Sequence, residues 1–148
     1  MRTLLILTLL LSSFANADAA ESTSTNDIRF VSNPASSAPF SRLVEVDGLI
    51  FLAGALGIDP KTGKLVAGGI EAESRQTMEN IKATLAKENV SMNRIVKCTV
   101  ILADIAEWPA LNAVYAEFFD GNYPARTAFE ASGLARDARV EIECIAKR

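Results

Sequence analysis

Residues 140–146 read VEIECIA, and this stretch near the end of the chain decides the arrangement of the fold. Apolar and acidic positions alternate in it as far as Cys144, which is typical of a β-strand with one buried face. Glu141 and Glu143 therefore point away from the apolar set, which consists of Val140, Ile142 and Cys144.

The preceding strand is expected at residues 125–131, which read ARTAFEA. One of its faces carries Thr127, Phe129 and Ala131, and the other carries Arg126, Ala128 and Glu130. If the apolar sets of both strands face the helices, Arg126 lies with Glu141 and Glu143 on the far face of the sheet.

Outward from these strands, hydrophobic spacing predicts two helices, at residues 70–88 and 105–119. Further strands are expected at residues 28–31, 43–46, 49–53 and 95–102, and a long loop at 54–69. Asp47-Gly48 predicts a tight hairpin. The predicted buried face of the strand at 95–102 consists of Val96, Cys98, Val100 and Leu102.

The resulting order, β-β-β-α-β-α-β-β, predicts one α/β sandwich with a single mixed sheet and both helices on one of its faces. The strand at 49–53 carries apolar residues on both faces, namely Ile50, Phe51 and Leu52. A second apolar face without helices needs another cover, so the sequence predicts a closed homo-oligomer with charged residues at its seams.

Composition excludes several kinds of chemistry. The chain of 148 residues has no histidine and two cysteines, which rules out the usual Ser-His-Asp and Cys-His systems and a four-ligand zinc site. The net charge of −3 and the lack of a basic stripe argue against a nucleic-acid partner. Cys98 and Cys144 can form a disulfide or remain buried thiols, and we favour thiols because a domain of this size does not need the bridge.

The first 19 residues, MRTLLILTLLLSSFANADA, predict a cleavable signal peptide, with cleavage after Ala17 or Ala19. The apolar run is too short to span a membrane, so no membrane association is expected after cleavage. Residues 20–26 are polar and predict a disordered leader, which leaves residues 27–148 as the folded domain. The mature protein is expected to be periplasmic or secreted.

Several stretches in the same order resemble the RidA (reactive intermediate/imine deaminase, YjgF-type) family. The most specific are Pro124-Ala125-Arg126-Thr127 and residues 140–146; the supporting pieces are Gly54, residues 59–63 (DPKTG), 76–81 (QTMENI), 96–100 (VKCTV) with Asp104, and 111–119 (LNAVYAEFF). The likeness extends over residues 28–147, and its specificity lies in the ordered set rather than in any single piece.

The resemblance implies a chorismate-mutase-like α+β subunit and a homotrimer with clefts between subunits. It implies hydrolysis of 2-imino or enamine acids, such as 2-aminoacrylate, to 2-keto acids and ammonia, with no cofactor and no metal. By position, Arg126 would bind the substrate carboxylate and Glu141 would position the attacking water. Substrate-binding roles would fall to Gly54, Asn112 and the backbone around Thr127 and Ala128.

The chain departs from the family pattern at three places. Ala128 replaces a frequent cysteine, Phe40 replaces a cleft tyrosine, and Ala53 replaces a serine. These changes make the cleft less polar and favour bulkier or more apolar imino acids. Two other functions stay open: a non-catalytic trimer that binds small carboxylates or acts as a holdase and, ranked last, a ribonuclease, for which there is neither a histidine nor a basic groove.

Overall fold

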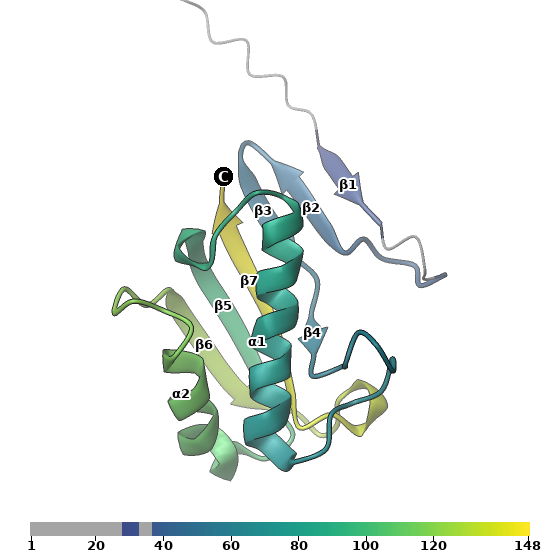
Figure 1. The fold of residues 1–148 in the computed structure, drawn as a ribbon, viewed down its shortest axis with the longest axis vertical. Coiled ribbons are helices and arrows are strands. Elements are labelled where there is room, and N and C mark those ends of the chain that lie inside the picture. Colours follow the sequence, from purple (N-terminus) through teal and green to yellow (C-terminus); the bar gives the residue numbers. More distant parts are fainter. Residues whose placement is uncertain (1–27, 33–36) are drawn as a thin grey trace, which may run out of the picture.

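A computed structural model describes residues 28–32 and 37–148 (Figure 1). The predicted signal peptide and leader lie outside the described residues, so both stay predictions. The elements are β1 (Arg29–Val31), β2 (Leu43–Val46), β3 (Leu49–Leu52), β4 (Ala55–Leu56), α1 (Gly69–Lys87), β5 (Ile95–Leu102), α2 (Trp108–Ala116), β6 (Ala125–Glu130) and β7 (Val140–Lys147). Short 3-10 turns occupy Met92–Arg94, Ile105–Glu107 and Ala135–Asp137.

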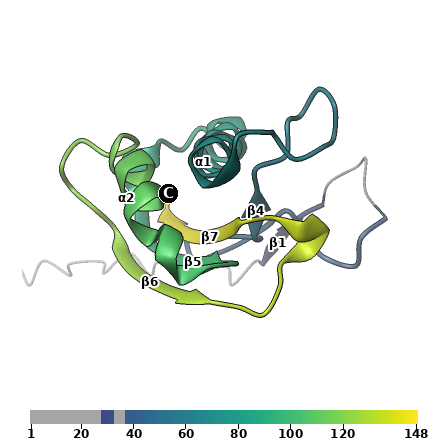
Figure 2. The ribbon, with the colours of Figure 1, turned by 90° about the horizontal axis from the view of Figure 1, so that it is seen from below.

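In the part of the chain that the structure describes, the strands form one mixed seven-stranded sheet in the order β1-β2-β3-β7-β5-β6, with β4 also paired to β7. Only β5 and β6 are parallel, and α2 forms the crossover between them. Both helices lie on the same side of the sheet, which confirms the predicted layers (Figure 2). The architecture is the chorismate-mutase-like α+β fold that the sequence led us to expect.

The core lies between the helices and the sheet. The apolar residues that recur at helical spacing in α1, namely Ile70, Met78, Ile81 and Leu85, are buried, and α2 contributes Leu111, Tyr115 and the following Phe119. These side chains pack on the inner face of the central strands, where the fully buried residues are Ile50, Val100, Leu102, Val140 and Ile142. Removing each large apolar side chain from water stabilises the fold by about 1.5–3 kcal/mol.

One connection between the strands differs from the prediction and another agrees with it. The expected loop at 54–69 contains β4, whose residues Ala55 and Leu56 pair with Ile142 and Glu141 of β7. A two-residue strand gives no readable alternation, so its sequence could not reveal it. The hairpin at Asp47-Gly48 is confirmed, and both residues have the positive φ values, 50° and 70°, that this turn requires.

The start of β5 corrects one predicted core residue. A register shift separates Ile95 from Lys97 in the pairing with β7. This irregularity buries Ile95 and turns Val96 outward, where its side chain is 47% exposed. The prediction that Val96 belongs to the core was therefore wrong, because a bulge reverses the alternation on one side of it.

The pairing of β5 with β6 determines which way Arg126 points. Cys98 lies opposite Arg126 and Val100 lies opposite Ala128 in this parallel pair. Directly paired residues of neighbouring strands point to the same face, and Cys98 and Val100 are buried beneath the helices. Arg126 and Ala128 therefore lie on the helix-covered face.

The prediction that Arg126 shares the far face with Glu141 and Glu143 was thus wrong. It assumed that the apolar Phe129 marks the inner face of β6, but the structure turns Phe129 outward, where it is 45% exposed. Because β6 is an edge strand with mixed faces, its register with β5 decides its orientation, and its own alternation does not.

Cys98 and Cys144 form a disulfide, which corrects the preference for two thiols. The two residues lie directly opposite each other on β5 and β7, and both side chains are buried. Adjacent antiparallel strands bring the two Cα atoms within 4.1 Å, and this proximity was not readable from a sequence separation of 46 residues.

The far face of the sheet carries no described helix (Figure 2). In register across β3, β7, β5 and β6 it presents Phe51, Ile145, Ile101, Thr99, Phe129 and Thr127, with Glu141 and Glu143 among them. Phe51 is 39% exposed. An apolar sheet face of this kind is a surface that a partner can cover.

Candidate functional site

Arg126 lies half-buried in a pocket of about 340 Å³ between α2 and the start of β6. Its Nη2 donates a hydrogen bond to Asn112 Oδ1 at 2.6 Å. The guanidinium carbon lies 4.7 Å from the ring centre of Tyr115 and 5.7 Å from that of Trp108. These contacts fix the orientation of the cation, and each aromatic contact is worth about 0.5–2 kcal/mol.

No carboxylate among residues 28–32 and 37–148 forms an ion pair with Arg126. Among the described residues, its side-chain hydrogen bond goes to the neutral amide of Asn112. A held guanidinium without a counterion is suited to bind an anion, because its planar fork matches the two oxygens of a carboxylate.

Helix α2 builds this pocket through its spacing. Trp108, Asn112 and Tyr115 follow one another at intervals of four and three residues, which places all three on one face of the helix. Burial raises the pKa of Tyr115 to about 12, although the nearby positive charge of Arg126 opposes the shift. Tyr115 therefore stays neutral at ordinary pH and gives the guanidinium an uncharged aromatic surface.

Glu141, Gly54 and Phe40 line a second cavity, of about 610 Å³. The side chain of Glu141 lies directly over Gly54, since a Cβ built on this glycine would be 1.9 Å from Glu141 Oε1. Phe40 is 66% exposed at the same cavity. Glycine is therefore needed at position 54 to leave room for the carboxylate of Glu141.

The turn before β7 holds Glu141 in place. The backbone N–H of Arg139 donates to Glu73 Oε2 of α1 at 2.9 Å, and the guanidinium of Arg139 pairs with Glu107. On the other side, β4 pairs with β7 at Glu141 itself. The Glu141 carboxylate thus projects from a strand whose beginning is anchored by a hydrogen bond to Glu73 and an ion pair with Glu107.

The two groups of residues do not meet within one chain. Arg126 pairs with Cys98 of β5, whereas Glu141 pairs with Ile101, three residues further along the same strand. Two strand spacings and three residues separate their Cα atoms by roughly 14 Å, and the side chains point to opposite faces. One subunit therefore presents two half-sites, and these half-sites can form one cleft only if a second copy contributes one of them.

Thr127 and Ala128 lie outside the residues that line either cavity. The Thr127 side chain is exposed on the far face, and Ala128 packs against the core. Both belong to β6 at the edge of the sheet, where part of the backbone is free of strand partners. Their predicted role through the backbone stays a prediction.

Sequence reasoning did not connect two aromatic residues with Arg126: Tyr115, which lines its pocket, and Trp108, whose ring faces the guanidinium. Both belong to the hydrophobic spacing that predicts the helix at residues 105–119, and that spacing was the available signal for a wall of the site. It could not be connected with Arg126, because only the register of β6 brings the arginine beneath α2.

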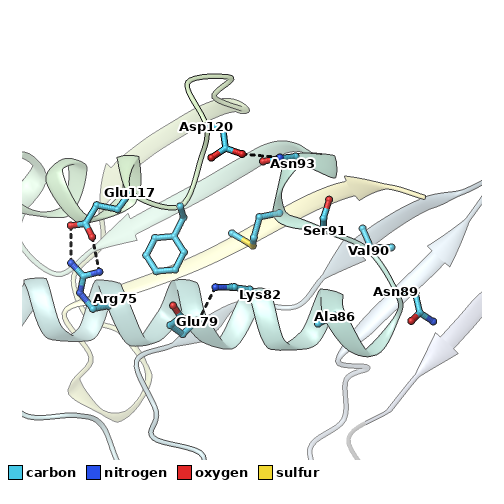
Figure 3. Close-up of a pocket in the computed structure, with 12 residues that line it drawn as sticks. Arg75, Glu79, Lys82, Ala86, Asn89, Val90, Ser91, Asn93, Glu117 and Asp120 are labelled. Atoms are coloured by element: carbon cyan, nitrogen blue, oxygen red, sulfur yellow. Dashed lines mark hydrogen bonds and ion pairs between the residues drawn. The ribbon is translucent and has the colours of Figure 1, made fainter.

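A further groove, of about 650 Å³, lies between α1 and the end of α2 (Figure 3). It contains none of the predicted site residues. Its charged rim is already paired: Arg75 donates two hydrogen bonds to Glu117, and Asn93 donates one to Asp120. These pairs leave few free groups for chemistry, so the groove is a poor candidate for an active site.

Within the described ranges, no helix is long and apolar enough to cross a membrane. Over the same residues, no group of three or more acidic or sulfur-bearing side chains lies close enough together to hold a metal ion.

Comparison with known proteins places the chain in a family. A family model described as Endoribonuclease L-PSP matches residues 30–148. A mouse protein named 2-iminobutanoate/2-iminopropanoate deaminase is 41% identical over 113 residues, which are 76% of this chain and 84% of that protein.

Solved structures agree with this placement. A protein of Entamoeba histolytica described as an endoribonuclease L-PSP superposes with a TM-score of 0.77 at 36% identity, over 82% of this chain and all of that chain. RidA from an Antarctic Psychrobacter superposes with a TM-score of 0.73 at 35% identity, over 82% of this chain and 98% of that chain.

Proposed function

The chain belongs to the Endoribonuclease L-PSP family, the RidA-type proteins whose motifs its sequence carries, and from this premise we propose that it is an imine deaminase. The reaction hydrolyses a 2-imino acid: water adds to the C=N carbon, the C–N bond breaks, and a 2-keto acid and ammonia leave. Relatives at about 40% identity carry the name of such a deaminase.

The observation that carries this proposal is the guanidinium of Arg126. It is held by Asn112 and two aromatic rings and has no carboxylate partner among the described residues. A 2-imino acid has its carboxylate directly beside the reacting carbon. Binding that carboxylate in two parallel hydrogen bonds therefore fixes the reacting carbon as well.

Glu141 is the group that positions water in this proposal. The substrate C=N bond is already electrophilic, so a water molecule held by a carboxylate suffices and a strong base is not required. The absence of histidine from the sequence fits such a mild reaction. Tetrahedral breakdown then needs only proton movement between the water-derived hydroxyl, the carboxylate and the leaving amine.

We place the complete cleft between subunits of a homotrimer. Two observations support an assembly: the half-sites of Arg126 and Glu141 lie on opposite faces of one chain, and the sheet face that exposes Phe51 and Phe129 is not covered by any described helix. The test is the mass in solution. A Phe129→Asp variant should shift the protein toward the monomer, whereas a protein that is monomeric at all concentrations would contradict the assembly.

The activity is tested by generating imino acids with an amino-acid oxidase and following their loss above the rate in buffer. Wild-type protein should accelerate this loss, and Arg126→Ala should reduce kcat/KM by at least about a hundredfold, because the bound carboxylate orients the substrate. Arg75→Ala, on an arginine already paired with Glu117, is the matched control. Full activity of Arg126→Ala would refute the assignment.

The second candidate is a trimer that binds small carboxylates without turnover. Phe40, Ala53 and Ala128 carry no side-chain hydroxyl or thiol, which is the observation that favours it. Calorimetry with 2-ketobutyrate separates the two functions: binding without acceleration of imine loss supports this candidate.

A further inference from the structure

The cavity beside Glu141 is much larger than a three-carbon acid needs. Its volume of about 610 Å³ falls within the range that holds drug-sized ligands. Gly54 and the acidic Glu141 are among its lining residues. Most of the remaining wall is apolar and comes from β3, the segment around β4, helix α1 and the N-terminal loop, with Phe40, Leu52, Leu56, Ile58 and Ile81.

The amide in this wall is not free to bind a ligand. Asn80 Nδ2 donates to the carbonyl oxygens of Leu56 and Ile58 at 2.9 and 2.8 Å, and Asn80 Oδ1 accepts from Gln76. Both functional atoms of Asn80 are thereby occupied, the nitrogen in holding the β4 segment against α1 and the oxygen within the helix. This pairing removes one polar side chain from the groups in the wall that could bind a ligand.

Two cations lie in the wall: Arg136, whose Nη1 donates to the carbonyl oxygen of Gly63 at 2.9 Å, and Arg42. Arg42 Nη2 is 3.6 Å from Glu88 Oε1, so its charge faces a carboxylate. Its Nε is buried and has no hydrogen-bond partner among the residues described. Arg42 could therefore bind the second acidic group of a dicarboxylate ligand. The experiment below must distinguish such a ligand from one with an apolar side chain.

From this lining we propose that the cavity is a side-chain subsite that selects 2-imino acids with large apolar side chains, branched aliphatic or aromatic, over 2-iminopropanoate. The inference rests on the proposed deaminase function. The substrate carboxylate binds Arg126 of one subunit, the reacting carbon lies near Glu141 of another, and the side chain enters the apolar cavity behind Gly54 and Phe40.

The expected size of the preference follows from burial. Each methylene removed from water favours binding about fourfold. The imino acid derived from leucine has three more carbons than the one derived from alanine, so its kcat/KM should be at least about tenfold higher. Methionine- and phenylalanine-derived imino acids should share this advantage.

The experiment measures kcat/KM of the full-length protein on imino acids made from alanine, leucine, phenylalanine and glutamate. Thr84, half-buried on α1, lines the cavity, whereas its neighbour Ala83 is exposed and does not. Thr84→Trp should fill the cavity and reduce the leucine-to-alanine ratio at least about tenfold. Ala83→Trp, the same side chain one residue away, should leave that ratio at the wild-type value.

A second readout does not depend on turnover. Calorimetry should show 4-methyl-2-oxopentanoate binding more tightly than pyruvate to wild type and losing that advantage in Thr84→Trp. If no imino acid is accelerated, the deaminase function fails, and this binding comparison still decides the subsite. Equal or weaker binding of the larger keto acid, or tighter binding of 2-oxoglutarate through Arg42, overturns the proposal.

Discussion

Replacing Gly54 with alanine is the sharpest test of how Glu141 is positioned. The new Cβ would lie 1.9 Å from Glu141 Oε1 and 2.8 Å from its Cδ, so the carboxylate must move by more than about 1 Å to reach ordinary contact. A displacement of this size in a catalytic group can reduce activity about a hundredfold. We therefore expect kcat/KM of Gly54→Ala for 2-imino acids to fall by roughly this factor, or about 2.7 kcal/mol.

The same substitution should change stability little. Glu141 is half-buried, so its side chain can rotate away from the new Cβ. Alanine also lowers the conformational entropy of the unfolded chain relative to glycine, which stabilises the folded state by about 0.4–1 kcal/mol. Urea unfolding should therefore place Gly54→Ala within about 1 kcal/mol of wild type. Loss of activity together with preserved stability identifies a positioning effect and excludes a folding defect.

Two further variants complete this test. Gly133→Ala is the matched control, because a Cβ at Gly133 meets nothing within 4 Å. Glu141→Gln combined with Gly54→Ala should lose little more activity than Glu141→Gln alone, since both changes remove the same positioned carboxylate. Full activity of Gly54→Ala, or losses that simply multiply in the double variant, would refute the reasoning.

Three other outcomes follow from the structure. Cys98→Ala/Cys144→Ala removes a link across 46 residues and should lower the free energy of unfolding by about 4 kcal/mol in urea denaturation, so an unchanged midpoint would contradict a structural role for the bridge. Hydrogen bonds from arginine side chains, first Arg148 and then Arg29, lower the pKa of Glu45 from 4.5 to about 2. Because the pKa of Glu45 is lower in the folded state, the stabilisation is present above pH 4.5 and is lost as the pH falls toward 2. The melting temperature of Glu45→Gln should not show this pH dependence. A wild-type-like pH profile of the variant would argue against the ion pairs of Glu45 as its source. Asn112→Asp places a carboxylate against Arg126 and should raise KM for imino acids at least about tenfold, more than Asn112→Ala does, and the reverse order would count against an anion site at Arg126.

The layers of the fold could be predicted because local periodicity reflects burial directly. The apolar residues of α1 recur at helical spacing and the sequence of β7 alternates as far as Cys144, and both patterns are confirmed. Alternation failed at Val96 and in β6, where a bulge in one case and an edge position in the other removed the link between a residue's place in the pattern and its face. Both failures concern pairing partners, which are distant in sequence.

The sequence identified the candidate site residues, but it did not show which of them lie close together in the folded chain. Arg126 and Asn112 come together through a hydrogen bond at 2.6 Å, and Gly54 and Glu141 through close packing, while the two pairs stay on opposite sides of the sheet. Each grouping depends on strand register across β5. A register is a property of several segments at once, so it leaves no mark in any single stretch of sequence.

Sequence by itself determined the element order, the two layers and the kinds of side chain available for chemistry, because propensity, periodicity and composition act locally or on the whole chain. Tertiary structure alone decided the disulfide, the face of Arg126 and the separation of Arg126 from Glu141 on opposite faces of the sheet. Each of these depends on which atoms meet across strands 14 or more residues apart, and only the folded backbone fixes those meetings.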